Sequence, residues 1–112
     1  MPIRTIVHPE YTILHVPDHF RYAERTHFKA AVANALKEGC RRVIVDLADV
    51  NFIDSTALSV LAMTAQAMKQ EQRTFGLLRP REPVLKLLTI SGIHKMMPIY
   101  QSEREVLATH SA

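Results

Sequence analysis

The chain has 112 residues, 47% of them hydrophobic and 22% charged, with a formal net charge of +3. This length suits one domain, and the apolar content is enough for a folded core, which excludes a disordered tail. No window approaches the roughly 20 apolar residues that span a bilayer, so membrane insertion is not expected. The basic residues are scattered and have no interleaved aromatic residues, which argues against direct binding of nucleic acid.

The cysteine content and the N-terminus bear on the compartment. The single cysteine, Cys40, excludes an intramolecular disulfide and fits a reducing environment. The segment Met1-Pro2-Ile3-Arg4 has no long apolar stretch after its charge, so no signal peptide is expected. Both observations predict a cytoplasmic protein.

The first half of the chain predicts two strands and a helix. Residues 3–8 and 11–16 are rich in Ile, Val, Thr and Tyr and flank a turn that contains proline, a pattern typical of short strands. Residues 17–22 are expected to form an irregular link. Apolar residues at helical spacing then predict a helix over residues 23–37, which Gly39 ends as a C-terminal cap.

The next segments alternate between strand and helix. Residues 43–47, Val-Ile-Val-Asp-Leu, form a nearly continuous apolar run, which indicates a strand covered on both faces. Residues 51–55 lead from this strand into a long helix over residues 56–71. Residues 74–78 then predict another apolar strand.

The last third of the chain predicts two helices separated by a strand. Pro83 suits the first turn of a helix, and Gly92 suits the position that ends it. Residues 97–100 predict a short strand at a sheet edge, because Pro98 cannot donate a ladder hydrogen bond. Residues 102–105 match a capping box that opens a final helix.

The predicted order of elements is β-β-α-β-α-β-α-β-α. Strands that alternate with helices form layered α/β folds with a largely parallel sheet. We therefore expect one α/β domain over residues 1–112, with a mixed central sheet of about five strands and about four helices.

Three polar residues, Asp54-Ser55-Thr56, stand between the buried strand and the long helix. Either Asp54 or Ser55 can cap the helix, because each side chain can accept a hydrogen bond from an N–H group of the first turn. Capping accounts for one polar residue at this junction. It does not account for three, so the junction is a candidate functional site.

The long helix has apolar residues on two sides. At 100° per residue, four of them share the face expected to pack on the core: Leu58, Leu61, Ala62 and Ala65. Three others fall on the opposite side: Val60, Met63 and Ala67. Two explanations stay open. Either neighbours enclose the helix on both sides, or the second side is a docking face beside Ser55.

Three segments together resemble the STAS family, in particular its anti-sigma-factor antagonists. The segments are Val43-Ile44-Val45-Asp46-Leu47, Phe52-Ile53-Asp54-Ser55-Thr56-Ala57-Leu58 and Leu87-Leu88-Thr89-Ile90-Ser91-Gly92-Ile93. The family typically shows a hydrophobic strand that ends in Asp-Leu, a Phe/Ile-Asp-Ser-Ser/Thr-Gly-Leu segment, and a helix that ends in Leu-x-x-x-Gly-Leu/Ile. The order of elements also matches, so the resemblance covers nearly the whole chain and implies a single STAS domain.

The resemblance implies control by phosphorylation. In antagonists of this family, a serine kinase of the histidine-kinase-like ATPase type, which is also the anti-sigma factor, phosphorylates the serine after the motif aspartate. A serine phosphatase removes the phosphate, and a downstream effector is a further partner. The corresponding serine is Ser55, with Asp54 and Thr56 as its surroundings. Such a protein acts by binding, so no catalytic residue, cofactor or metal is expected.

Two positions depart from the family pattern. Ala57 stands where the family has glycine, and Arg21 stands where these domains often have an acidic residue. The departure at Arg21 implies either a divergent partner kinase or a loss of this regulation. The surface that binds the partner is expected to include Arg21, Ser59, Val60 and Met63.

Other functional classes are less well supported by the residues. The chain has no cysteine pair, no His-Glu-x-x-His pattern, no Gly-x-Ser-x-Gly elbow and no glycine-rich phosphate loop. Two alternatives within the family stay open. One is a constitutive adaptor subunit of a larger assembly such as a lipid transporter, and the other is a sensor of nucleotides or small ligands.

Overall fold

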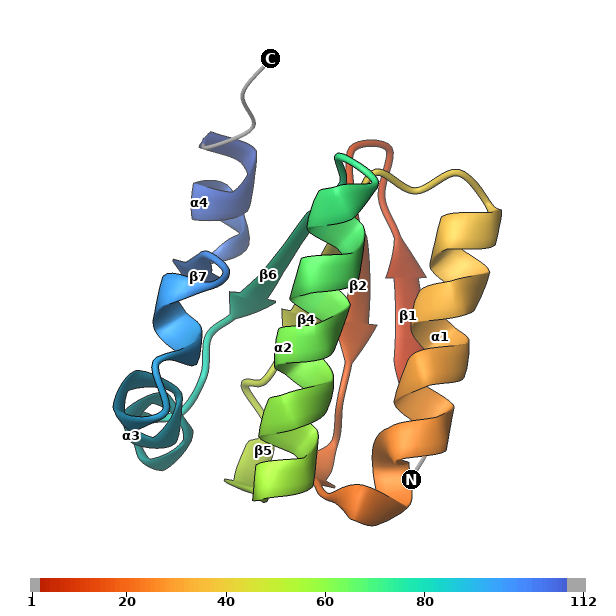
Figure 1. The fold of residues 1–112 in the computed structure, drawn as a ribbon. Helices are drawn as coiled ribbons and strands as arrows, with labels where there is room; N and C mark the ends of the chain where they lie inside the picture. The colour runs from red at the N-terminus through yellow and green to blue at the C-terminus, as the bar shows by residue number, and fades with distance from the viewer. Residues whose placement is uncertain (1–2, 109–112) are drawn as a thin grey trace.

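The computed structural model describes residues 3–108. These residues fold into a five-stranded sheet with helices on both faces (Figure 1). The strands are β1 (Arg4–Val7), β2 (Thr12–His15), β3 (Asp18–Phe20), β4 (Arg42–Asp46), β5 (Val50–Ile53), β6 (Thr74–Leu78) and β7 (Ile99–Tyr100). The α-helices are α1 (Arg25–Lys37), α2 (Ser55–Gln70), α3 (Glu82–Ile90) and α4 (Glu103–Ala108), with 3₁₀ turns at Tyr22–Glu24 and Ile93–Lys95. Within the same residues, no helix is both long and apolar enough to cross a membrane.

The main sheet has the strand order β1-β2-β4-β6-β7. β1 pairs with β2 in antiparallel orientation, and all the other neighbours in this sheet are parallel. β3 and β5 pair in parallel as a separate two-stranded sheet. The prediction of an α/β fold with a mixed sheet of about five strands and about four helices is confirmed.

The central strand β4 is buried along its whole length, as its apolar sequence predicts. Its alternate side chains point to opposite faces of the sheet and enter two different cores. Val43 and Val45 belong to the larger core, whereas Ile44 belongs to the smaller one.

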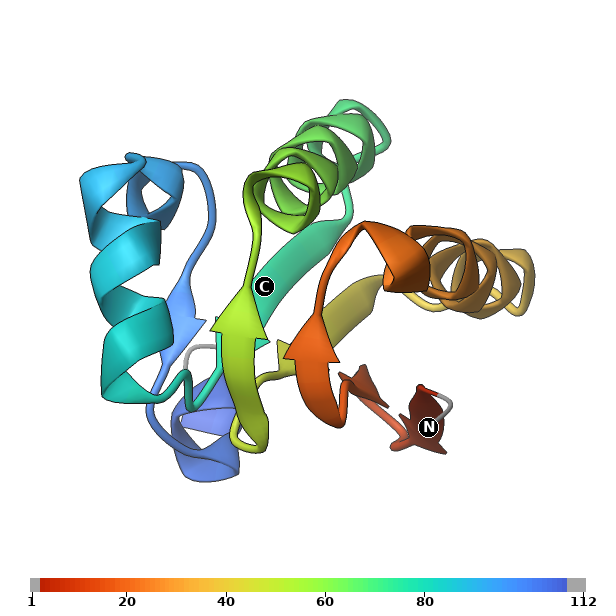
Figure 2. The same cartoon turned by 90° about the horizontal axis from the view of Figure 1, so that it is seen from below.

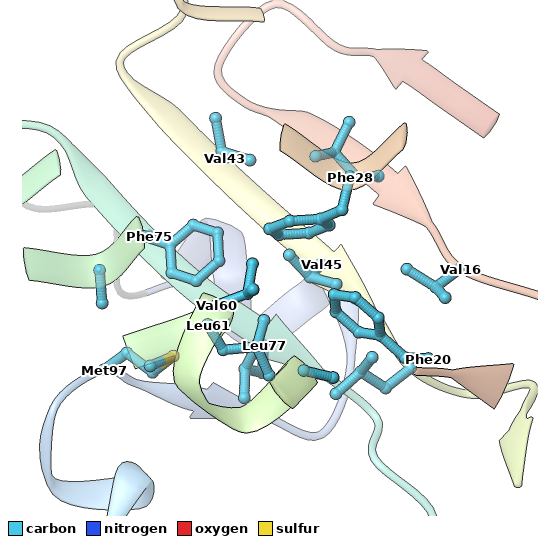
Figure 3. Close-up of a cluster of buried hydrophobic side chains, with 14 of the residues drawn as sticks. Val16, Phe20, Phe28, Val43, Val45, Val60, Leu61, Phe75, Leu77 and Met97 are labelled. Atoms are coloured by element: carbon cyan, nitrogen blue, oxygen red, sulfur yellow. The ribbon is translucent and has the colours of Figure 1, made fainter. Parts of the chain in front are cut away.

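The larger core lies between the sheet and the two helices α1 and α2 (Figures 1 and 3). Its centre contains three aromatic rings from β3, α1 and β6. The rings of Phe20 and Phe28 are 5.0 Å apart between centroids, and those of Phe28 and Phe75 are 6.4 Å apart. Val60 and Leu61 of α2 point into the same cluster (Figure 3).

α4 covers the opposite face of the sheet from α1 and α2 (Figure 2). Its Val106 is fully buried in a cluster that includes Ile44. The Tyr11 hydroxyl donates to Glu103 Oε1 at 2.8 Å, and Arg42 Nη2 donates to the Val106 carbonyl at 2.9 Å. Burial, followed by the hydrogen bond to Glu103, raises the pKa of Tyr11 to about 12. The helix is thus held by packing and by polar contacts at both of its ends.

Two of the segments expected to be links are in fact the strands β3 and β5. β3 lies inside the predicted link at 17–22, and β5 overlaps the predicted link at 51–55. Both are short and contain polar residues, so neither shows the local pattern of a buried strand. Their pairing holds the chain before α1 against the chain before α2.

The predicted helix ends at Gly39 and Gly92 are confirmed. Both glycines have left-handed backbone angles, with φ of +87° and +82°, which a side chain would disfavour. Pro83 lies in the first turn of α3, also as predicted.

Candidate phosphorylation site and partner-binding surface

Asp54, and not Ser55, is the N-cap of α2. Its backbone is extended, and its Oδ1 accepts a hydrogen bond from the N–H of Ala57 at 2.9 Å. Its Oδ2 accepts a second hydrogen bond from the N–H of Tyr22 at 3.0 Å. The sequence left both residues open as caps, and the structure assigns the role to the aspartate.

The surroundings of Asp54 favour its charged form. Removal of water from around the carboxyl raises its pKa, as the largest single effect. Backbone hydrogen bonds from Ala57, Tyr22 and Thr56, followed by the charge of Arg21, lower the pKa. Together they outweigh the loss of water, so the pKa of Asp54 lies below its ordinary value of 3.8.

Ser55 is the first residue of α2 and is exposed to solvent. Its two neighbours in the sequence, Asp54 and Thr56, are half-buried. Because Asp54 caps the helix, the hydroxyl of Ser55 is not needed to hold the end of α2. It is presented at the surface on a rigid, well-packed element.

The segment before α1 lies directly beside this serine. The N–H of Asp54 donates to the Phe20 carbonyl at 3.3 Å, and the N–H of Tyr22 donates to the Asp54 side chain. Arg21 stands between these two anchored residues and is exposed. The structure therefore brings the residues on both sides of Arg21 against Asp54, although Tyr22 and Asp54 are 32 positions apart in the sequence.

Tyr22 and Arg25 belong to the same surface, although no sequence motif marks them as candidate site residues. The guanidinium of Arg25 lies 4.2 Å from the centre of the Tyr22 ring and donates to the Tyr22 hydroxyl at 3.2 Å. Tyr22 is 59% exposed. The pairing of β3 with β5 brings Tyr22 against Asp54, and neither strand has a local pattern that predicts this pairing.

The expectation that Val60 lies on an exposed side of α2 is wrong. Val60 is only 4% exposed, because α1 packs beside α2 and encloses this side of the helix. Leu58 and Ala62, expected on the core face, are only half-buried. The explanation in which neighbours enclose the helix on both sides therefore holds for Val60.

Met63 and Ser59 do face solvent, and Met63 is 65% exposed. Met63 lies at the mouth of a shallow groove of about 220 Å³ between α1 and α2. Val60 forms part of the floor of this groove, and Val32 and Leu36 line it from α1. Eight residues of α-helix, or about 12 Å, separate Met63 from Ser55 along the axis of α2.

Comparison with known proteins identifies the family. The sequence profile of the STAS domain matches residues 2–106. The chain belongs to the STAS domain family. In this STAS domain, the family segment from Phe52 to Leu58 forms the junction of β5 and α2, where Asp54 and Ser55 lie.

Several relatives of this STAS domain are named as antagonists of anti-sigma factors. The anti-sigma F factor antagonist of Paenibacillus polymyxa is 31% identical over 68 residues, which cover 61% of this chain and 58% of that protein. The anti-sigma-B factor antagonist of Staphylococcus epidermidis is 26% identical over 97 residues, or 87% of this chain and 90% of that one. A crystal structure of an anti-sigma factor antagonist from Mycobacterium paratuberculosis has a TM-score of 0.82 at 20% identity, covering 95% of this chain and 90% of that chain. The crystal structure shares the fold, and the two relatives are named as antagonists.

Proposed function

We propose that this STAS domain is a partner-switching regulator of the anti-sigma-factor antagonist type, controlled by reversible phosphorylation of Ser55. The observation that carries the proposal is the position of Ser55: an exposed hydroxyl at the first residue of α2, directly after the aspartate that caps the helix. The family motif and the names of the relatives support the same assignment.

Phosphorylation at this position would change the surface and leave the fold intact. A phosphoryl group adds about −1.5 to −2 charges at neutral pH. The start of α2 is capped by Asp54, whose hydrogen bonds do not involve the Ser55 hydroxyl. A partner that packs closely against Ser55 would meet a bulky, hydrated dianion, and its binding would weaken.

The proposed partner surface consists of exposed residues on either side of Ser55. Arg21 and Tyr22 lie on one side, and Ser59 and Met63 follow along α2 on the other. Val60 is too deeply buried for direct contact, and its proposed role is to support Met63 from below.

In this proposal the protein binds and does not catalyse. Asp54 is the acidic residue next to Ser55, but its carboxylate is occupied by backbone hydrogen bonds and has a lowered pKa, which makes it a poor general base. The nucleotide, the metal and the base would come from a partner serine kinase of the histidine-kinase-like ATPase type. A serine phosphatase would reverse the reaction, and the cytoplasm is the compartment in which these partners would meet.

The test is phosphorylation by the cognate kinase followed by mass spectrometry of the intact protein and its peptides. We expect one phosphate, on Ser55, and none on the Ser55→Ala variant. Phosphate on Thr56 or Ser59 with Ser55 unmodified would refute the proposed site. A protein that stays unmodified but binds its partners tightly would instead act as a constitutive adaptor.

A further inference from the structure

Three N–H groups in the first turn of α2 already donate to Asp54. Its side chain accepts hydrogen bonds from Ala57 and Thr56, and its backbone carbonyl accepts one from Leu58 at 3.1 Å. Free N–H groups are what normally make a helix start attractive to an anion. A phosphoryl group on Ser55 would therefore find these donors occupied and the Asp54 carboxylate beside it.

Arg21 supplies the positive charge at this place. The hydrogen bonds of Phe20 and Tyr22 to Asp54 fix the backbone on both sides of Arg21. The charge of Arg21 already acts on the Asp54 carboxyl and lowers its pKa. Arg21 is thus close enough to influence a charge at the next residue, Ser55.

The guanidinium of Arg21 is able to reach a new partner. Its Nη2 contacts His19 Nε2 at 3.0 Å in an exposed contact, which involves one of the three guanidinium nitrogens. Exposed contacts of this kind contribute little to stability and are easily exchanged. Phosphate is a better acceptor than imidazole, because it offers two charged oxygens to the planar fork of an arginine.

Arg25 is a less suitable candidate for the same role. Its guanidinium lies over the Tyr22 ring and also donates to the Tyr22 hydroxyl. The acidic groups on this segment are Asp18 and Glu24, which both lie near His19. Glu24 also accepts a hydrogen bond from the backbone N–H of Arg21 at 2.8 Å, and it stays within reach of that residue in either state of Ser55. Arg21 therefore has the less engaged guanidinium of the two, and its neighbours Phe20 and Tyr22 are hydrogen-bonded to Asp54.

We propose that Arg21 is the intramolecular counter-ion of the phosphoryl group on Ser55. The inference rests on the proposed phosphorylation of Ser55 and adds a regulatory property to that site. On modification, the guanidinium turns from His19 to the phosphoryl oxygens and offsets their repulsion of Asp54. Arg21 then offsets part of the local negative potential at the site, while the net charge of the surface still becomes more negative by about 1.5 to 2 units. An acidic residue at this position would have the opposite effect.

The test places phosphoserine at position 55 by genetic encoding, so that no kinase is needed. Phosphorus NMR then follows the second ionisation of the phosphate with pH. We expect Arg21→Ala to raise the titration midpoint by about 0.2–0.7 pH unit, the range for an exposed ion pair. Arg21→Lys keeps the positive charge, so its titration midpoint should stay close to that of the protein with Arg21.

Two controls separate a local contact from other effects. Arg41 is also exposed, but it lies in the loop between α1 and β4, at the other end of the molecule from the start of α2 (Figure 1). The Arg41→Ala variant should therefore leave the midpoint unchanged. Histidine titrates in the same pH range as phosphoserine, so each measurement is repeated in a His19→Gln background. The difference in titration midpoint between Arg21 and Arg21→Ala should persist in that background.

Equal midpoints for the wild-type protein and Arg21→Ala would overturn the assignment. An equal rise in Arg21→Ala and Arg41→Ala would also overturn it, because it would show only the general field of the protein. Either result would leave the proposed function standing, since the phosphate is introduced without a kinase. Conversely, a kinase that ignores Ser55 would refute the proposed function and leave this measured contact unaffected.

Discussion

The carboxylate of Asp54 and the backbone N–H of Tyr22 form a 3.0 Å hydrogen bond that joins the start of α2 to the segment before α1. The same carboxylate caps α2 through the N–H of Ala57. One side chain thus caps the start of a helix and also fixes the neighbouring segment before α1. Because Ser55 and Arg21 are the next residues on the two sides, this bond sets the geometry of the candidate site.

Asp54→Ala should lower the free energy of unfolding by about 1–2 kcal/mol, since a helix cap and a second backbone partner are both lost. The folded-state pKa of Asp54 lies below its ordinary value of 3.8. Its stabilising effect is therefore fully present above about pH 4 and is lost as the pH falls through the folded-state pKa. Denaturant titrations at several pH values should show that the difference in free energy of unfolding between the wild-type protein and Asp54→Ala becomes smaller in acid. An advantage that stayed constant there would contradict this role of the charge.

Gly76→Ala should destabilise the sheet through a clash between β6 and β7. A Cβ atom at Gly76 would lie 2.8 Å from a carbon of the Tyr100 ring and 3.2 Å from the Pro98 carbonyl oxygen. The ring can turn, but the backbone carbonyl cannot yield as easily, so we expect a loss of about 1–3 kcal/mol in thermal or denaturant unfolding. The double variant Gly76→Ala/Tyr100→Leu should recover part of that loss. No recovery would place the strain at Pro98.

Local sequence patterns were sufficient for most of the fold. The apolar run at residues 43–47 predicted a strand buried on both faces, and Gly39 and Gly92 marked helix ends with positive φ. These features depend on neighbours in the sequence, which explains why they could be predicted. The candidate serine was also found from its sequence context, because the family motif is contiguous.

Features that depend on distant residues were missed. β3 and β5 have no strong pattern of their own and form through pairing with each other, so the hydrogen bonds of Phe20 and Tyr22 to Asp54 could not be predicted. Arg21 was expected on the partner surface only because of the family resemblance. Helical periodicity showed two apolar sides on α2, but it could not show that α1 covers Val60 and leaves Met63 at the surface.

The variants Ser55→Ala and Ser55→Asp should differ in binding and not in folding. The cap of α2 is Asp54, so each change at this exposed position should alter stability by no more than about 0.5 kcal/mol. Ser55→Ala should bind the partner with the affinity of the unmodified protein, and Ser55→Asp should bind more weakly. Titration calorimetry with the partner kinase, alongside thermal melts, measures both quantities. Equal affinities would argue against a charge-sensitive interface at Ser55.

Glutamate substitutions at Met63 and Val60 form a matched pair on one helix. Met63 is 65% exposed and Val60 is 4% exposed, although they are only three positions apart. Met63→Glu should therefore keep the melting temperature and weaken partner binding by about 1 kcal/mol or more, as for a residue near the centre of an interface. Val60→Glu should lower the melting temperature sharply, because it places a charge in the core between α1, α2 and the sheet. The milder Val60→Ala should remain folded, with a loss of about 1–3 kcal/mol in stability and little change in the affinity of the folded fraction. If Met63→Glu bound its partner as tightly as the wild-type protein does, the proposed surface would end before the third turn of α2.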